Sequence, residues 1–226
     1  MQQKESQVKK IKIISLLNLK GGVGKTTLCI NLASMFKKKK MKPLVIDLDP
    51  QKSASMWAQQ KGSDFPIDVL PLSLESGPTK FKKELDACIL EYTPSVLLID
   101  NPPELDSTSQ CSCLLSDLVL IPVSPSPLDI WAAEKAIQVV KEARLERKGG
   151  LPKALFLPSK LQVGTVIGKE LLKTLKEFKE KIAPPVYQRV SMVESAIAGT
   201  TIDNYAPDGP SHKEFANLFK FVYKQM

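Results

Sequence analysis

Lys20-Gly21-Gly22-Val23-Gly24-Lys25-Thr26-Thr27 is the stretch of sequence that decides the fold. An apolar run rich in β-branched residues precedes it over residues 11–17 and is short enough for a buried strand. A segment with helical apolar spacing follows it, with Leu28, Leu32 and Phe36 in register. A glycine-rich loop between a strand and a helix N-terminus lets backbone N–H groups surround phosphate oxygens. The stretch therefore predicts a phosphate-binding loop.

The loop departs from the ordinary pattern G-x-x-x-x-G-K-[ST], because position 19 is Leu and an additional lysine, Lys20, precedes the glycines. In this form it resembles the deviant Walker A box of the ParA/MinD ATPases. The resemblance implies that Lys25 contacts the β- and γ-phosphates of ATP and that Thr26 holds Mg²⁺. It also implies that Lys20 reaches across an ATP-sandwiched homodimer to the nucleotide of the partner subunit. The loop residues implied to bind ATP or ADP are Gly21, Gly22, Val23, Gly24, Lys25, Thr26 and Thr27.

Two carboxylates, Asp47 and Asp49, follow a second apolar run that begins at Pro43. Alternate residues of a strand share a face, and ligands of open parallel sheets bind at the carboxyl ends of the strands. The run D-x-D-P-Q resembles the second nucleotide motif of the ParA family. That resemblance implies that Asp49 positions or activates the attacking water beside Mg²⁺, and that Asp47 supports the site.

A third apolar run, over residues 95–99, ends in Asp100. Continuous apolar residues followed by an acid form the Walker B pattern, whose carboxylate binds Mg²⁺ through water. The metal site expected from these motifs therefore comprises Thr26, Asp49 and Asp100. The segment from Arg189 to Pro207 resembles the C-terminal part of the family, and in relatives the end of the preceding strand packs against adenine. By that resemblance Tyr187 and Gln188 are the expected base contacts.

Strand and helix patterns alternate along the whole chain, which predicts an α/β fold with a mainly parallel twisted sheet and helices on both faces, the P-loop NTPase fold. We expect residues 1–10 to be a disordered lead-in and residues 11–226 to form one ATPase domain without an N-terminal DNA-binding domain. Further strands are expected at residues 67–72 (an edge), 117–123, 154–158 and 184–190. Further helices are expected at residues 53–58, 81–90, 130–147 and 169–182, and at the end of the chain.

The net charge of +8 suggests an anionic partner, either nucleic acid or an acidic membrane surface. Lys169, Lys173 and Lys176 on one helical stripe are candidates for a DNA-facing surface or for a plain solvated face. No apolar run approaches the roughly 18 residues of a membrane span, and the N-terminus lacks the apolar core of a signal peptide. We therefore expect a cytoplasmic protein.

The family resemblance implies an ATP-dependent switch that dimerises with ATP, binds DNA nonspecifically and hydrolyses ATP slowly. A ParB-like or other adaptor protein would stimulate hydrolysis, and the switch would partition or position a plasmid, a chromosome or another cargo on the nucleoid. A first alternative is a MinD-like switch that binds the membrane surface through the basic, amphipathic residues 212–226, although the Pro50-Gln51 pair favours ParA. A second is an iron–sulfur ATPase on the same fold, for which Cys111 and Cys113 are the candidate ligands.

Overall fold

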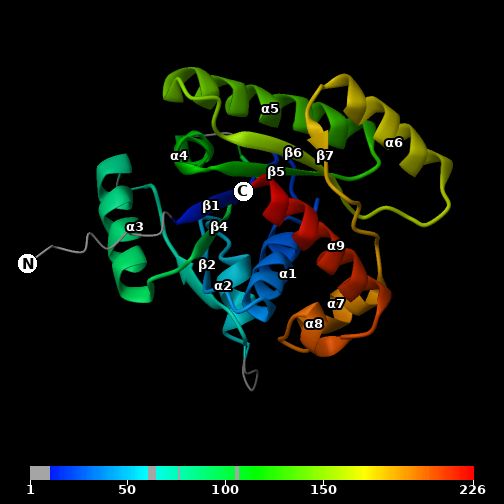
Figure 1. Ribbon diagram of the computed structural model, residues 1–226, viewed down its shortest axis with the longest axis horizontal. Coiled ribbons are helices and arrows are strands. Elements are labelled where there is room, and N and C mark those ends of the chain that lie inside the picture. Colours follow the sequence, from blue (N-terminus) through cyan, green and yellow to red (C-terminus); the bar gives the residue numbers. More distant parts are fainter. Residues whose placement is uncertain (1–10, 61–64, 76, 105–106) are drawn as a thin grey trace, which may run out of the picture.

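A computed structural model describes residues 11–60, 65–75, 77–104 and 107–226. The expected disordered lead-in, residues 1–10, lies outside these ranges. Within them, seven strands form one sheet of order β3-β2-β4-β1-β5-β6-β7, and each neighbouring pair is parallel. Figure 1 shows helices on both sides of this sheet, so the predicted α/β class and mainly parallel sheet are confirmed. The strands are β1 (Lys12–Leu16), β2 (Pro43–Asp47), β3 (Asp68–Pro71), β4 (Val96–Asp100), β5 (Leu118–Val123), β6 (Lys153–Pro158) and β7 (Lys181–Ile182).

The helices divide between the two faces according to which strand residues they cover. On one face, α1, α2 and α9, with α7 and α8 beside them, pack against residues such as Ile14 and Leu98; on the other, α3 to α6 pack against residues such as Leu97 and Phe156. The helices are α1 (Lys25–Lys38), α2 (Ser53–Ala58), α3 (Pro78–Tyr92), α4 (Ser107–Leu115), α5 (Pro127–Arg147), α6 (Val166–Glu177), α7 (Val190–Ile197), α8 (Ile202–Tyr205) and α9 (Pro210–Gln225). Burial on both faces explains why the central strands read as continuous apolar runs rather than alternating ones.

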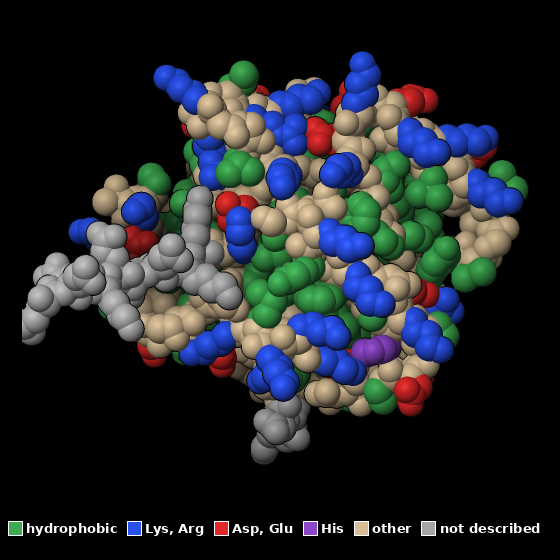
Figure 2. All heavy atoms as spheres, in the orientation of Figure 1, with side chains coloured by type: hydrophobic (Ala, Val, Ile, Leu, Met, Phe, Trp, Pro, Cys, Tyr) green, Lys and Arg blue, Asp and Glu red, His purple; other side chains and the backbone are tan. Residues whose placement is uncertain are grey.

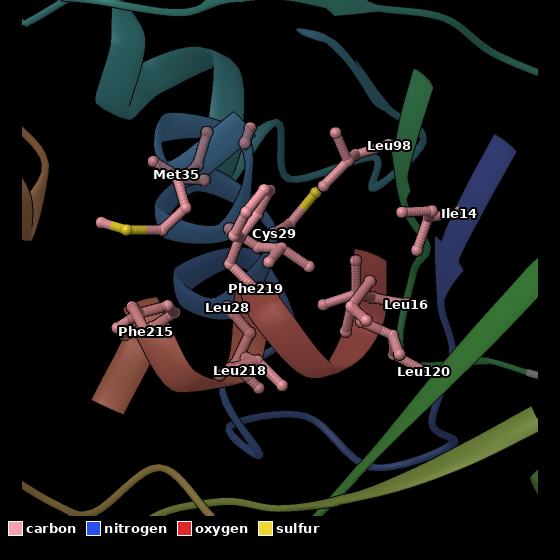
Figure 3. Close-up of a cluster of buried hydrophobic side chains, with 14 of the residues drawn as sticks. Ile14, Leu16, Leu28, Cys29, Met35, Leu98, Leu120, Phe215, Leu218 and Phe219 are labelled. Atoms are coloured by element: carbon pink, nitrogen blue, oxygen red, sulfur yellow. The ribbon is translucent and has the colours of Figure 1, made fainter. Parts of the chain in front are cut away.

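The last helix, α9, is part of the core. Figure 3 shows Phe215, Leu218 and Phe219 of α9 packed with α1 against the strand face that carries Ile14. The rings of Phe36 and Phe219 meet edge to face, with centroids 4.9 Å apart. The aromatic stripe of α9 is therefore committed to holding the domain together.

Two sequence expectations near the C-terminal third are wrong. The helix expected at residues 169–182 is α6, which ends at Glu177, and Lys181–Ile182 instead pairs with β6 as β7. The strand expected at residues 184–190 is absent from this part of the described chain, where a single bridge joins Leu161 to Tyr187 and α7 begins at Val190. The consecutive prolines 184 and 185 supply no N–H donors, so this segment can follow β6 but cannot build a continuous ladder.

The topology places the phosphate-binding loop at the centre of the carboxyl edge of the sheet. β1, which leads into the loop, lies between β4 and β5 in the sheet. The strands β2 and β3 lie on the β4 side of β1, and β6 and β7 lie on the β5 side, so the strand order reverses direction at β1. Crevices at such switch points are where open parallel sheets bind ligands. Among the described residues, no helix is long and apolar enough to cross a membrane.

Candidate nucleotide site

The backbone of the loop adopts conformations that glycine permits. Gly22 and Gly24 have φ of +77° and +94°, in the region that side-chain-bearing residues rarely adopt. Gly24 is the N-cap of α1, so the first N–H groups of that helix, from Lys25 onward, face the loop without intrahelical partners. No acidic residue occupies the first turn of α1. The loop therefore presents an array of N–H donors at the positive end of a helix, which suits a phosphate group.

Lys25 is buried beneath this loop. Its Nζ donates hydrogen bonds to the carbonyl oxygens of Asn18 and Lys20, both at 3.1 Å. An ammonium has three donors, so one remains for a phosphate oxygen. Burial lowers the pKa of Lys25, while the negative charges of Asp100 and Asp49 act in the opposite direction.

Lys20 takes a position that the sequence did not reveal. Its ammonium forms an ion pair with Asp129, a buried carboxylate in the first turn of α5, and the Ser124 hydroxyl donates to the same carboxylate. The Lys20 backbone N–H also donates to the Asn18 side chain at 3.0 Å. In the single chain the lysine is thus held by its own subunit, and its reach to a partner's nucleotide stays a prediction.

Asp47 organises the turn between β2 and α2. Its carboxylate is buried and accepts hydrogen bonds from the Ser55 N–H and hydroxyl, both at 2.8 Å, and from the Asp49 N–H at 3.2 Å. Both of its oxygens are therefore occupied by the protein. Asp47 lies in the cluster where it was expected, as a group that positions Asp49.

Asp49 is partly exposed and lines the same cleft as Lys25 and Thr26. One of its oxygens, Oδ1, accepts the Gln51 N–H at 2.9 Å, which fixes the direction of the side chain. Its other oxygen, Oδ2, is not engaged by this turn. The geometry leaves Asp49 able to meet a water or a cation in the cleft.

Asp100 is fully buried and lies beside Asp47 and Leu16 in the sheet register. Neither carboxylate oxygen has a partner with full hydrogen-bond geometry, although the Thr26 hydroxyl is near enough to lower its pKa. Burial dominates, and it raises the pKa of Asp100 to about 7. A bare buried carboxylate is costly unless a cation completes its environment.

These oxygens fit a magnesium ion. Mg²⁺ prefers carboxylate and hydroxyl oxygens, keeps several waters and takes further ligands from substrate phosphates. The unpartnered Asp100 carboxylate beside the Thr26 hydroxyl supplies such donors, with Asp49 at the cleft. Among the described residues, no group of three His, Cys, Asp or Glu is placed to hold a metal ion.

Two adjoining cavities extend from the loop. One, of about 620 Å³, is lined by the glycines of the loop, Lys25, Thr26 and Asp49. The other, of about 290 Å³, is lined by Tyr187, Gln188 and apolar side chains that include Met192. The ion pair of Arg189 with Glu214, at 2.7 Å, ties the Tyr187–Gln188 segment to α9. The two predicted base contacts therefore stand beside the loop, while their role stays a prediction.

Sequence reasoning missed Lys160, which lines both cavities. It follows the end of β6 with a φ of +53°, and the preceding Ser159 hydroxyl donates to the Val23 carbonyl of the loop at 3.0 Å. Its Cε lies 3.9 Å from where a Cβ on Gly24 would stand. The available signal was its place just after a strand, at the ligand-binding edge.

The cysteine pair considered for a metal cluster lies on α4. Cys113 is buried in the core against α5, and burial raises its pKa to about 12. Cys111 is partly buried, and burial raises its pKa as well. Both thiols are therefore in surroundings that disfavour the thiolate that a cluster needs.

Comparisons with known proteins find similarity over the part of the chain that contains the loop. The AAA domain family model matches residues 11–76, which contain the loop and the Asp47–Asp49 turn. Maintenance of carboxysome distribution protein A of Halothiobacillus neapolitanus is 34% identical over 134 residues, which cover 58% of this chain and 59% of that relative. The chain therefore matches little more than half the length of this relative.

Longer matches extend over the whole domain. The chromosome-partitioning ATPase Soj of Thermus thermophilus is 26% identical over 242 residues, covering 94% of this chain and 96% of Soj. The crystal structure of the Pyrococcus furiosus cell division ATPase MinD superposes with a TM-score of 0.78 at 19% identity, covering 96% of this chain and all of that one. At this identity the superposition shows that the fold is shared.

Proposed function

We propose that the chain is a P-loop ATPase of the ParA/MinD type, and that it is a Mg²⁺-dependent enzyme that works as a dimerising switch. One observation carries the proposal. A buried ammonium, Lys25, and a bare buried carboxylate, Asp100, flank a glycine-rich loop that opens on a cleft. That combination offers donors for a phosphate and oxygens for its metal ion.

In this proposal the residues act mainly by position and charge. Phosphoryl transfer spreads negative charge over the transferred group, so preorganised cations and N–H groups lower the barrier. Lys25 is held under the loop by two carbonyls, where its ammonium would face the phosphates. Asp49, oriented by Asp47 through the turn, would hold the attacking water in line.

Thr26, Asp100 and Asp49 are the residues that would hold Mg²⁺. The ion would offset the charge of the β- and γ-phosphates. Tyr187 and Gln188 would flank the adenine, since they line the cavity that joins the phosphate cleft at Gly24 and Lys160. Lys160 would lie over the bound nucleotide between its base and its phosphates.

Lys20 provides the switch between subunits. In the single chain it pairs with Asp129, and in an ATP-bound homodimer it would leave that partner for the nucleotide of the other subunit. Hydrolysis would remove the γ-phosphate and release the dimer. An adaptor of the ParB kind would accelerate this step, and isolated turnover would be slow.

We propose nonspecific DNA as the surface on which the dimer resides, and a plasmid, a chromosome or another cargo as the object it positions. The net charge of +8 supports an anionic partner. Among relatives, one is named for carboxysome distribution and another for chromosome partitioning. Both names describe the positioning of a large cargo inside a cell.

The MinD-like alternative meets a structural obstacle. Residues 212–226 would have to lay an apolar face on lipid, yet Phe215, Leu218 and Val222 of α9 are fully buried. Membrane insertion of α9 would therefore remove a helix from the core. We therefore propose DNA, in preference to a membrane surface, as the anionic partner.

The catalytic part of the proposal is tested by measuring phosphate release from ATP with and without Mg²⁺. We expect slow turnover by the wild-type chain that requires Mg²⁺ and is abolished by Lys25→Ala. Lys83→Ala, an exposed lysine on α3, is the control and should turn over at the wild-type rate. ATP binding without any Mg²⁺-dependent phosphate release would refute the hydrolytic role.

A further inference from the structure

The exposed face of α9 carries a row of lysines. Lys213, Asn217, Lys220 and Lys224 are all exposed and follow each other at steps of four, three and four residues, so they share one side of the helix. At 1.5 Å per residue the row spans roughly 16 Å. The opposite side of α9 is the buried apolar stripe that packs on α1.

Further lysines extend the row at both ends of the helix. At the far end, the ammonium groups of Lys153 and Lys181 donate to the backbone and side-chain oxygens of Gln225, both at 2.7 Å. At the near end, Lys38 of α1 is close enough to His212 to contribute, after burial, to lowering the pKa of that imidazole. We call Lys38, Lys213, Lys220, Lys224, Lys153 and Lys181 the basic stripe.

The charge of the basic stripe is not neutralised by its surroundings. None of its six lysines forms an ion pair with an acidic side chain of the described residues. The neighbouring acids are engaged elsewhere, because Glu214 pairs with Arg189 and Glu180 pairs with Arg144. Two acids lie near His212 at one end, Asp203, which accepts the Ser34 and Thr201 hydroxyls, and the exposed Asp208. Figure 2 shows Lys and Arg side chains spread over the face that carries the end of α9.

The parallel topology explains why the lysines gather here. Lys153 and Lys181 begin β6 and β7, and Lys38 ends α1, so all three lie at the amino edge of the sheet. Cations are also favoured at helix C-termini such as those of α1 and α9. This edge lies opposite the carboxyl edge that carries the candidate nucleotide site, whereas Lys213, at the start of α9, adjoins Glu214, which accepts the Tyr187 N–H.

We propose that the basic stripe is the surface through which this protein binds the phosphate backbone of duplex DNA. The inference rests on the proposed function and assigns a location to its DNA-binding step. The roughly 16 Å between Lys213 and Lys224 corresponds to about nine phosphate charges of duplex DNA, more than the three lysines of that row can contact. A lipid surface fits less well, since the apolar side of α9 is buried and cannot insert.

The test measures binding of a random-sequence duplex to the full chain with ATP, ADP and no nucleotide, over a range of salt concentrations. The test variant is Lys213→Gln/Lys220→Gln/Lys224→Gln. The control is Lys169→Gln/Lys173→Gln/Lys176→Gln, which removes the same charge from the exposed side of α6. Thermal unfolding and ATP binding of each variant confirm that the fold and the nucleotide site are intact.

With ATP, we expect the α9 variant to bind the duplex at least about tenfold more weakly than wild type. The slope of log K against log salt concentration should become shallower by about 2.7, which corresponds to the loss of three lysine–phosphate contacts. The α6 variant should keep the wild-type affinity and slope. If the α9 variant keeps both, or if the α6 variant alone loses them, the stripe is not the DNA surface and the proposed function stands. Failure of the wild-type chain to bind DNA in any state would overturn the proposed DNA binding itself. Binding to vesicles rich in anionic phospholipid in place of DNA, lost in the α9 variant, would assign the stripe to a membrane.

Discussion

Replacing Asp100 with asparagine should shift the stability of the free protein, relative to wild type, in favour of the variant as the pH rises. The buried Asp100 carboxylate has a pKa of about 7, against 3.8 in an unfolded chain. The folded state therefore binds more protons than the unfolded state between these values, and the stability of the wild type falls as pH rises through this window. At 1.36 kcal/mol per unit, the ionised carboxylate costs the folded state about 4 kcal/mol above pH 7.

The side-chain amide of the Asp100→Asn variant does not titrate, so the variant lacks this cost. Without nucleotide or metal, we expect the stability of Asp100→Asn relative to wild type to increase by roughly 2–3 kcal/mol between pH 5 and pH 8. Any penalty for burying the amide is the same at both pH values and cancels from the difference. The stability of Asp100→Asn relative to wild type must therefore increase, and not decrease, from pH 5 to pH 8.

Urea unfolding of both chains at pH 5 and pH 8 measures this difference. Asp86→Asn, on the exposed side of α3, gives the background effect of losing a surface carboxylate. A stability difference that does not change with pH, or that shrinks toward pH 8, would refute the idea that Asp100 is an uncompensated buried acid. The same Asp100→Asn variant should lose Mg²⁺-dependent ATP hydrolysis, since the amide carries no charge for the cation.

Three further predictions concern other residues of the candidate site. Lys160→Ala should raise the Kd for both ATP and ADP about tenfold, from the loss of one charge-assisted contact, while Lys160→Arg should restore binding; equal affinities in a calorimetric titration would contradict this. Asp129→Asn should free Lys20 and lower the protein concentration needed for ATP-dependent dimerisation by about fivefold, by light scattering, and weaker dimerisation would argue against the resting pair. Ser55→Ala should cost about 1.5–3 kcal/mol of unfolding free energy, because Asp47 loses one of its partners; a change below about 0.5 kcal/mol, the scatter of surface substitutions, would show that the contact is unimportant.

The sequence brought out much of the candidate nucleotide site because its residues belong to contiguous motifs at strand ends. The loop at residues 20–27, the turn at Asp47–Asp49 and the end of β4 at Asp100 each follow an apolar run that the sequence displays. Parallel pairing then brings the three runs to one edge. The sheet class followed from the same alternation of strands and helices.

Other parts of the site depend on distant pairs that no local pattern records. The Lys20–Asp129 contact joins the loop to the first turn of α5, and the Ser159–Val23 bond places Lys160 over the loop. The apparent strand at residues 184–190 misled for a different reason. Its residues are apolar and β-branched in part, but the two prolines remove the donors that a ladder requires.

The most direct test of the account is the binding of nonspecific double-stranded DNA in the ATP, ADP and nucleotide-free states, for the wild type and for Lys20→Ala. The account predicts binding in the ATP state alone, with loss of that binding in Lys20→Ala even though the variant still binds ATP. Binding that is the same in all three states, or that survives in Lys20→Ala, would contradict the proposal that ATP-dependent dimerisation through Lys20 controls the protein.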